Sequence, residues 1–378
     1  MKAMIVLEDG SVFNGVSIGV SGERIGEVVL NTAVVGYQEM ITDPANAGKI
    51  LVLTYPLIGN YGVAKKFYES KKHWVTGLVI KEASRIYSNW QAEGSFNDFL
   101  KSEGILAISD VDTRTLAVGI RDNGEMLGII STSDFNKESL LRKIASYKKT
   151  QKRDYIKEIS VKRPHEIKTS SSAPTIAVLD LGMINSFISQ LKTLGCNIRL
   201  LPYDTDACAI LEAAPNGLII SGGPENDTAL PAIAGTIKEL LGKVPMMGIG
   251  TGHQAIGLAL GAKLKKMKVG HHGVNYPVKG RDSYKGDITV QNHSFVVDEG
   301  SLKNRDVSVT LRNINDETVE EMESRVLKFL STQYYPASPG FDEVNAAFKR
   351  FLAMARSHKA GRPKKRTNSC SEVNYAKA

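Results

Sequence analysis

The residues best placed for chemistry lie in a glycine-rich segment, Met246–Gln254, where an apolar run leads directly into Gly248, Gly250 and Gly252. A strand that enters a sharp turn opening a helix lifts a side chain above a sheet. It also aims helix N–H groups at developing negative charge. The segment therefore predicts a nucleophile elbow. A dinucleotide-binding Gly-x-Gly-x-x-Gly loop is not favoured, because it requires glycine where His253 stands.

Three histidines suggest a second kind of site. His271, His272 and His293 could ligate a metal ion, but the sequence shows no clear carboxylate pattern to accompany them. None of the three cysteines stands in a Cys-x-x-Cys or Cys/His pattern. We therefore expect packed or hydrogen-bonded histidines and no metal.

The elements that must position the glycine-rich turn alternate between strand and helix. Helices are expected near residues 186–194, 229–241 and 253–260, between apolar runs at 175–179, 197–201, 217–220 and 244–249. Such alternation predicts βαβ units and a parallel sheet with helices on both faces. Ligands of these sheets bind outside the carboxyl ends of the strands.

The first 150 residues are predicted to be strand-rich. Two apolar runs flank an Asp9–Gly10 turn, which favours a hairpin, and further β-type runs follow at 27–30 and 49–53. A Lys-rich stretch without a steady apolar period predicts a linker. The expected domains are residues 1–150, a linker at 151–173, a second domain at 174–355 and a basic, disordered tail at 356–378.

Composition indicates a globular protein. The 378 residues carry 42% hydrophobic and 23% charged residues, and no apolar stretch approaches membrane-spanning length, so we expect a cytoplasmic protein without membrane contact. Most of the +8 net charge lies in the tail, where seven Lys/Arg face one acid. That tail, with Gly361–Arg366 resembling a minor-groove hook, could contact nucleic acid or an acidic surface.

The elbow segment resembles that of class I glutamine amidotransferases, whose pattern is Gly-Ile-Cys-Leu-Gly-His-Gln. The stretch Lys268–Val278 narrows the resemblance to the small subunit of carbamoyl phosphate synthase. Motifs in the first half resemble the same family: Gly36–Glu39, Thr42–Pro44, Leu53–Gly62 and Asp112–Leu116.

The resemblance implies an α/β protein with a strand-rich N-terminal small-subunit domain. A class I glutamine amidotransferase domain with a mostly parallel sheet and flanking helices would follow it. In that family a cysteine thiolate attacks glutamine, a histidine assisted by a glutamate moves the proton, and ammonia passes to a large subunit. The implied partner is that large subunit, in a hetero-oligomer. ATP and magnesium would belong to it, and this chain needs no cofactor.

The catalytic positions depart from the family pattern. Gly250 stands at the cysteine position and Tyr335 at the histidine position, and the glutamate is absent between Pro336 and Ala337. Since all three groups are lost, we expect no useful glutaminase activity.

The expected glutamine-binding shell is also altered. Glu225 replaces the second glycine of the family's glycine loop, and Ala45 replaces a glutamine-contacting serine. The vestigial glutamine-binding positions are Gly223, Thr251, Gln254, Asn292, Ser294, Phe295 and Ala45. We expect glutamine to bind weakly.

No substitute nucleophile is expected. Thr251 lies one residue beyond the nucleophile position and points elsewhere, while His253 belongs to the following helix and has a structural role. Cys196 is expected to be a buried, inert thiol.

Two functions follow as hypotheses. In the first, the chain is a non-hydrolytic small subunit whose large partner makes carbamoyl phosphate from ammonia, a ligase reaction of pyrimidine and arginine biosynthesis. In the second, it is a non-enzymatic ligand- or nucleic-acid-binding protein outside that complex. A decaying gene would show the same substitutions.

Overall fold

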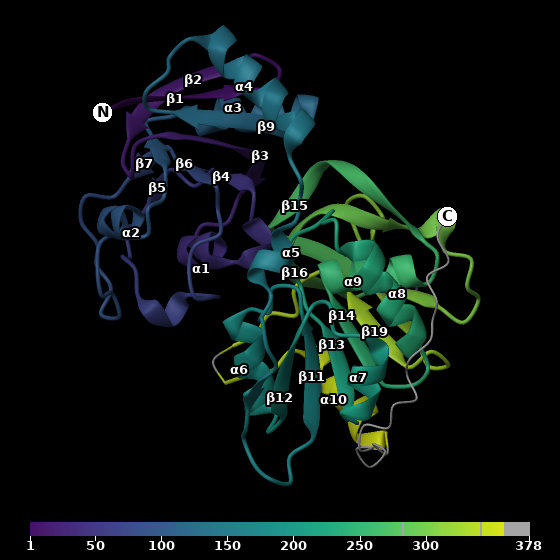
Figure 1. Cartoon of the computed structure of the whole chain (residues 1–378). Coiled ribbons are helices and arrows are strands. Elements are labelled where there is room, and N and C mark those ends of the chain that lie inside the picture. The colour runs from purple at the N-terminus through teal and green to yellow at the C-terminus, as the bar shows by residue number, and fades with distance from the viewer. Residues whose placement is uncertain (282, 341, 359–378) are drawn as a thin grey trace.

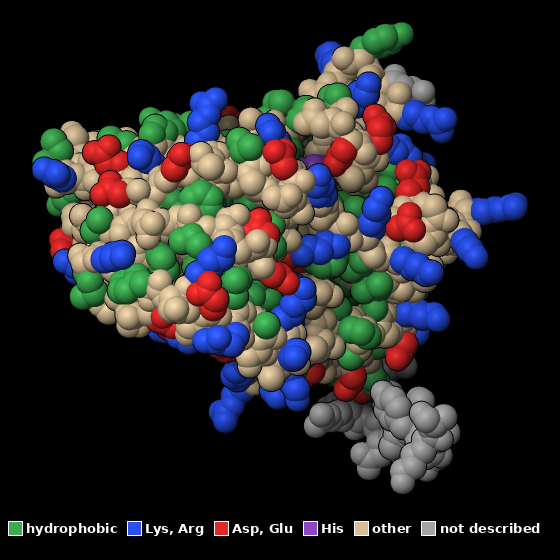
Figure 2. All heavy atoms as spheres, turned by 90° about the horizontal axis from the view of Figure 1, so that it is seen from above, with side chains coloured by type: hydrophobic (Ala, Val, Ile, Leu, Met, Phe, Trp, Pro, Cys, Tyr) green, Lys and Arg blue, Asp and Glu red, His purple; other side chains and the backbone are tan. Residues whose placement is uncertain are grey.

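The computed structural model describes residues 1–281, 283–340 and 342–358. It consists of a barrel domain and a larger sheet domain that meet along one side (Figure 1). Most of the tail, including Gly361–Arg366, lies outside the described residues. Within the described part, no helix has both the length and the apolar character needed to cross a membrane. Figure 2 shows Lys and Arg side chains intermixed with Asp and Glu across the visible face.

The N-terminal domain is a closed seven-strand barrel in the order β1-β2-β8-β6-β4-β3-β9. The predicted hairpin is confirmed, since β1 and β2 pair antiparallel around a turn in which Asp9 accepts a hydrogen bond from Ser11 N. Its strands are β1 (Lys2–Leu7), β2 (Val12–Ser17), β3 (Glu23–Asn31), β4 (Lys49–Leu53), β6 (Gly77–Val79), β8 (Ala107–Ser109) and β9 (Met126–Ser131). A separate two-strand sheet pairs β5 (Leu57–Ile58) with β7 (Glu82–Ala83).

Short helices cover this barrel. They are α1 (Tyr37–Thr42), α2 (Phe96–Ser102), α3 (Thr113–Asn123) and α4 (Lys137–Thr150), with 3-10 turns η1 (Pro44–Asn46) and η2 (Lys65–Phe67). The N-cap residues of α2, α3 and α4 are Ser95, Asp112 and Asn136. The side chain of each accepts a hydrogen bond from a backbone N–H of the first turn. The sequence analysis did not anticipate these helices.

The segment expected to be a linker, 151–173, contains regular structure. Helix α5 (Tyr155–Ile159) and strand β10 (His165–Ile167) lie within it. Strand β10 pairs with β12 of the second domain and forms the edge of its sheet. Asp227 of that domain accepts a hydrogen bond from Ile156 N at 3.0 Å. The connection is therefore packed onto the second domain.

The second domain is built on a ten-strand sheet in the order β10-β12-β11-β13-β14-β19-β18-β17-β15-β16. The neighbouring strands β12, β11, β13, β14 and β19 pair parallel, as predicted. The remaining pairs are antiparallel and were not anticipated. The strands are β11 (Thr175–Asp180), β12 (Asn197–Pro202), β13 (Gly217–Ile220), β14 (Met246–Ile249), β15 (Lys263–Lys279), β16 (Gly286–Asp298), β17 (Ser308–Asn313), β18 (Val319–Ser324) and β19 (Phe329–Thr332).

Helices pack on both faces of this sheet (Figure 1). On β11, Ala177 and Leu179 face one core with α7, α8 and α9, whereas Ile176 and Val178 face another with α6 and α10. The helices are α6 (Asn185–Thr193), α7 (Ala207–Glu212), α8 (Leu230–Leu240), α9 (Thr251–Ala259) and α10 (Ala346–Ser357), with the 3-10 turn η3 (Glu299–Ser301). Parallel strands buried on both faces explain the continuous apolar runs of the sequence.

Candidate functional site

The glycine-rich turn has the backbone geometry of an elbow. Strand β14 ends at Ile249 and helix α9 begins at Thr251, with Gly250 between them at φ 53° and ψ −112°. Gly250 N donates to the Thr332 carbonyl at 2.8 Å, and the Gly250 carbonyl accepts from Gln254 N at 3.1 Å. The elbow is thus held by its backbone, without a side chain at its apex.

The space beside Gly250 is bounded by Tyr335. A Cβ atom at position 250 would lie 3.6 Å from Cε1 of Tyr335 and 3.9 Å from the Gly222 Cα. These are ordinary contact distances, so a small side chain would fit there, although at a φ of 53° that residues with a Cβ rarely adopt. A side chain at position 250 would face the Tyr335 ring.

The three groups considered as substitute nucleophiles are engaged elsewhere. The Thr251 hydroxyl donates to the Gly223 carbonyl at 2.6 Å. His253 Nδ1 lies 3.0 Å from the Ser331 hydroxyl, and burial lowers the pKa of His253 to about 4. Cys196 is buried, which raises the pKa of its thiol. None presents an activated nucleophile to the elbow.

Tyr335 is tied to the N-terminal domain. Its hydroxyl donates to Asp43 Oδ2 at 2.9 Å, and its ring meets Phe187 edge to face at 5.6 Å. Asp43 also accepts from Asn292 Nδ2 at 3.0 Å and from Ala45 N at 2.9 Å. Burial raises the pKa of Tyr335 well above its usual range, so the phenol stays neutral. It bridges the two domains and does not provide a base.

The segment after Tyr335 is fixed through its backbone. The Pro336 carbonyl accepts from Gln190 Nε2 and the Ala337 carbonyl from Asn345 Nδ2, each at 2.9 Å. No side chain in Tyr335–Ala337 carries a carboxylate. The carboxylate that contacts Tyr335 is Asp43, from the other domain.

The predicted binding shell gathers around the Glu225 carboxylate. Glu225 Oε2 accepts from Ser294 N at 2.7 Å, and Oε1 accepts from Phe295 N at 3.1 Å. Gln254 Nε2 donates to the same Oε1 at 2.6 Å. Three donors of the predicted shell therefore serve a carboxylate of the chain itself.

Little free volume remains next to Glu225. The cavity that adjoins it is about 20 Å³ and is lined in part by Ala45, Pro224, Ser294 and Phe295. That volume suits about one water molecule. This cavity is too small for a free amino acid.

A larger cavity, about 210 Å³, lies on the domain-boundary side of Tyr335. Asn292 and Tyr335 line it, together with the carboxyl groups of Glu39, Asp43 and Glu69. Burial raises the pKa of Glu69 to about 7. The predicted site is therefore divided: one group of residues surrounds Glu225, while Asn292 and Tyr335 border this second space.

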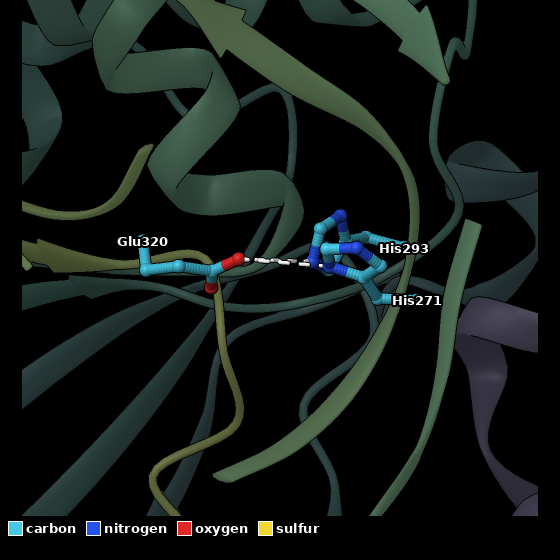
Figure 3. A group of neighbouring side chains, drawn as sticks. All are labelled: His271, His293 and Glu320. Atoms are coloured by element: carbon cyan, nitrogen blue, oxygen red, sulfur yellow. Dashed lines mark ion pairs between the residues drawn. The ribbon is translucent and has the colours of Figure 1, made fainter. Parts of the chain in front are cut away.

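The candidate metal histidines also separate. His271 and His293 point toward the Glu320 carboxylate (Figure 3), whereas His272 Nε2 lies 3.2 Å from Glu125 of the barrel domain. The accompanying carboxylate that the sequence did not reveal is thus Glu320. It lies in β18, far from the histidines in sequence.

Sequence reasoning missed two residues of this region, Asp43 and Glu320. Asp43 was noted only as part of a motif, and its bond to Tyr335 spans 292 positions of the chain. Glu320 lies in β18 and is fully buried. No sequence signal singles it out, because Glu321 and Glu323 lie in the same short strand.

The comparisons agree with this architecture. Residues 5–130 match the family model "Carbamoyl-phosphate synthase small chain, CPSase domain", and residues 177–354 match "Glutamine amidotransferase class-I". The carbamoyl phosphate synthase pyrimidine-specific small chain of Halalkalibacterium halodurans is 39% identical over 360 residues, covering 95% of this chain and 98% of its own. The small chain of Syntrophotalea carbinolica is 38% identical, covering 95% of this chain and 99% of its own.

Among solved structures, a putative GMP synthase subunit from Thermoplasma acidophilum overlaps with a TM-score of 0.42 at 20% identity. The overlap covers 50% of this chain and 96% of that one. The two family models together match most of the sequence. The chain therefore belongs to the carbamoyl phosphate synthase small-chain family.

Proposed function

We propose that this chain is a small-chain homologue that does not hydrolyse glutamine and that supports a large synthetase chain making carbamoyl phosphate from free ammonia. The observation that carries the proposal is Gly250, which leaves the apex of the elbow without a nucleophilic atom. Tyr335 and the Pro336–Ala337 junction supply neither a base nor a carboxylate to orient one.

The size of the expected loss supports this function. Removing a nucleophile or base of a hydrolytic triad lowers kcat by about 10⁶-fold, and what remains comes from donors aimed at the oxyanion and from binding. Here a neutral phenol faces the elbow, and Thr251 is bonded to the glycine loop. Residual hydrolysis is expected at background.

Glu225 supports the same function from the binding side. Its carboxylate uses Ser294 N, Phe295 N and Gln254 Nε2, donors that the family resemblance assigns to glutamine binding. Glutamine would have to displace a carboxylate that is covalently part of the chain and already in place. Such an intramolecular competitor has a high effective concentration.

The retained framework is consistent with a partner-binding role. The Tyr335–Asp43–Asn292 bonds join the two domains where a catalytic pocket would otherwise open. ATP and magnesium would act on the large chain, in the cytoplasm, and the product would enter pyrimidine or arginine biosynthesis. In this role the chain contributes only its folded surface, which stabilises the large chain while the large chain uses ammonia.

The test is carbamoyl phosphate synthesis by the large chain of the same organism, with and without this chain, using glutamine or ammonium chloride. We expect the chain to raise the ammonia-dependent rate and to give no glutamine-dependent rate. The matched control is an active small chain from a relative, which should confer glutamine dependence on the same large chain.

Two results would overturn the proposal. Glutamine-dependent synthesis would mean that another group replaces the triad. If neither donor responds and the two chains do not co-purify, the chain acts outside the complex.

A further inference from the structure

Four potential ligand atoms converge in a buried cluster that the glutamine site does not use. They are His271 Nδ1 on β15, His293 Nε2 and Gln291 Oε1 on β16, and Glu320 Oε1 on β18. Figure 3 shows both imidazoles and the carboxylate pointing toward one another. All of these side chains are buried.

The outer hydrogen bonds aim one nitrogen of each histidine inward. His271 Nε2 lies 3.0 Å from Asp316 Oδ2, so the proton on Nε2 is donated to that carboxylate. His293 Nδ1 lies 3.2 Å from the Phe295 carbonyl, which can only accept. Partners of this kind fix the tautomer of metal-binding histidines and leave the other nitrogen free to coordinate.

Gln291 is oriented in the same sense. Its amide nitrogen donates to the Thr289 hydroxyl at 3.1 Å, which leaves Oε1 facing the histidines. Oε1 lies 2.7 Å from His271 Nδ1 and 3.2 Å from His293 Nε2. At 2.7 Å the Nδ1 proton of His271 is donated to Gln291 Oε1 in the metal-free chain, and a bound ion displaces that proton.

The spacing suits a small tetrahedral ion. With bonds of about 2.0 Å, neighbouring ligand atoms of a tetrahedron lie about 3.3 Å apart. Glu320 Oε1 lies 3.7 Å from His271 Nδ1 and 3.6 Å from His293 Nε2. Ligand atoms of the two histidines and Glu320 all fall within 4.8 Å of one another.

Glu320 has only long contacts to its partners, since Oε1 lies 3.7 Å from His271 Nδ1 and 3.6 Å from His293 Nε2. Its side chain is fully buried, and its one hydrogen bond, from the Thr318 hydroxyl to Oε1, is 3.5 Å long. Oε2 has no partner among the described residues, and nearby His253 Nε2 has none either. A buried carboxylate in this state is costly unless a cation neutralises it.

We propose that His271, His293 and Glu320, with Gln291 as the fourth ligand, bind one divalent ion of the zinc class. The site holds β15, β16 and β18 together, and β16 also carries Asn292 and Phe295. The ion has a structural role, because every ligand position is filled by the protein.

The experiment uses the full chain without a histidine tag. After metals are removed with a chelator, Zn²⁺ is titrated by calorimetry, and Co²⁺ is added as a spectroscopic probe. We expect one tight Zn²⁺ equivalent with proton release, and a strong visible Co²⁺ band typical of four-coordinate geometry. Because this band is recorded on the unaltered chain, it does not depend on a variant folding.

Two variants and a control locate the site. Glu320→Gln and His293→Gln should each weaken Zn²⁺ binding more than tenfold, whereas His165→Gln, on the exposed strand β10, should leave it unchanged. The proposal is overturned if the unaltered chain takes up no stoichiometric zinc. Octahedral Co²⁺, or a folded Glu320→Gln variant that binds zinc as tightly as the unaltered chain, would overturn it as well.

Discussion

Glu225 and Glu320 are both buried carboxylates that lie against strand β16, beside the neighbouring residues Ser294 and His293. Glu225 accepts three hydrogen bonds of 2.6 to 3.1 Å. Glu320 accepts one of 3.5 Å and lies 3.7 and 3.6 Å from nitrogens of His271 and His293. The first carboxylate fills a binding site and closes it, while the second leaves a site that attracts a cation.

The largest expected effect comes from rebuilding the catalytic groups around Glu225. A variant with Gly250→Cys, Tyr335→His and a glutamate inserted between Pro336 and Ala337 should stay at background glutaminase activity. Adding Glu225→Gly should raise glutamate release by at least about 100-fold, since the triad alone is worth several orders of magnitude. Full activity from Gly250→Cys alone would contradict our account of the other losses.

Truncating Glu225 should cost substantial stability. Glu225→Ala leaves Ser294 N and Phe295 N without their acceptor, while Gln254 Nε2 keeps the Phe295 carbonyl and Gln333 Oε1, and the free energy of unfolding should fall by about 2–4 kcal/mol. Glu225→Gln keeps one acceptor oxygen and should lose about half as much.

Urea unfolding measures both losses, with the exposed Glu138→Ala as the matched control. Equal losses from Glu225→Ala and Glu225→Gln would show that these hydrogen bonds do not determine the stability of the loop.

The Glu69 carboxylate is intermediate between those of Glu225 and Glu320 in its hydrogen bonding. It accepts one backbone hydrogen bond, from Ser186 N at 2.9 Å. Burial raises the pKa of Glu69 from 4.5 to about 7, so the folded state holds a proton that the unfolded state has released. The free energy of unfolding should therefore fall by roughly 2–3 kcal/mol as the pH rises from about 4.5 to 7.

Glu69→Gln should flatten that part of the pH profile, measured by urea unfolding at several pH values. An unchanged slope in the variant would assign the titration to another group.

The smallest effect is expected at the bond between the domains. Tyr335→Phe removes only the hydroxyl that donates to Asp43, whose other donors Asn292 and Ala45 remain. The free energy of unfolding should fall by about 1 kcal/mol. Tyr87→Phe, on an exposed ring, is the control, and a similar loss there would mean that the Tyr335–Asp43 bond contributes nothing measurable.

The sequence predicted those parts of the fold that local pattern determines. The apolar runs of β11, β13 and β14 face cores on both sides, so they stand out without any knowledge of the tertiary structure. The hairpin of β1 and β2 depends on an Asp-Gly turn, which is also local. The antiparallel extension was missed because the burial pattern of β15 is irregular and its pairing with β16 shifts register twice.

The candidate site was predictable where a motif marks it and not where distant segments meet. Gly250 and the shell residues follow from the elbow pattern, and the structure places Gly223, Thr251, Gln254, Ser294 and Phe295 near one another. The closing role of Glu225, the Asp43–Tyr335 bond and the histidine–Glu320 cluster depend on packing between segments that are far apart. No local periodicity encodes those contacts.

The adjacent histidines of β15 have a consequence for how the chain reaches its fold. Successive residues of a strand point to opposite sides, so His271 meets Glu320 while His272 meets Glu125 of the barrel. A register shift of one residue during hairpin formation would exchange the sides to which His271 and His272 point. Both imidazoles would then lie away from their carboxylate partners. The correct register is therefore favoured by two separate contacts. His271 contacts Glu320 in the same domain, and His272 contacts Glu125 in the barrel domain, which is synthesised first.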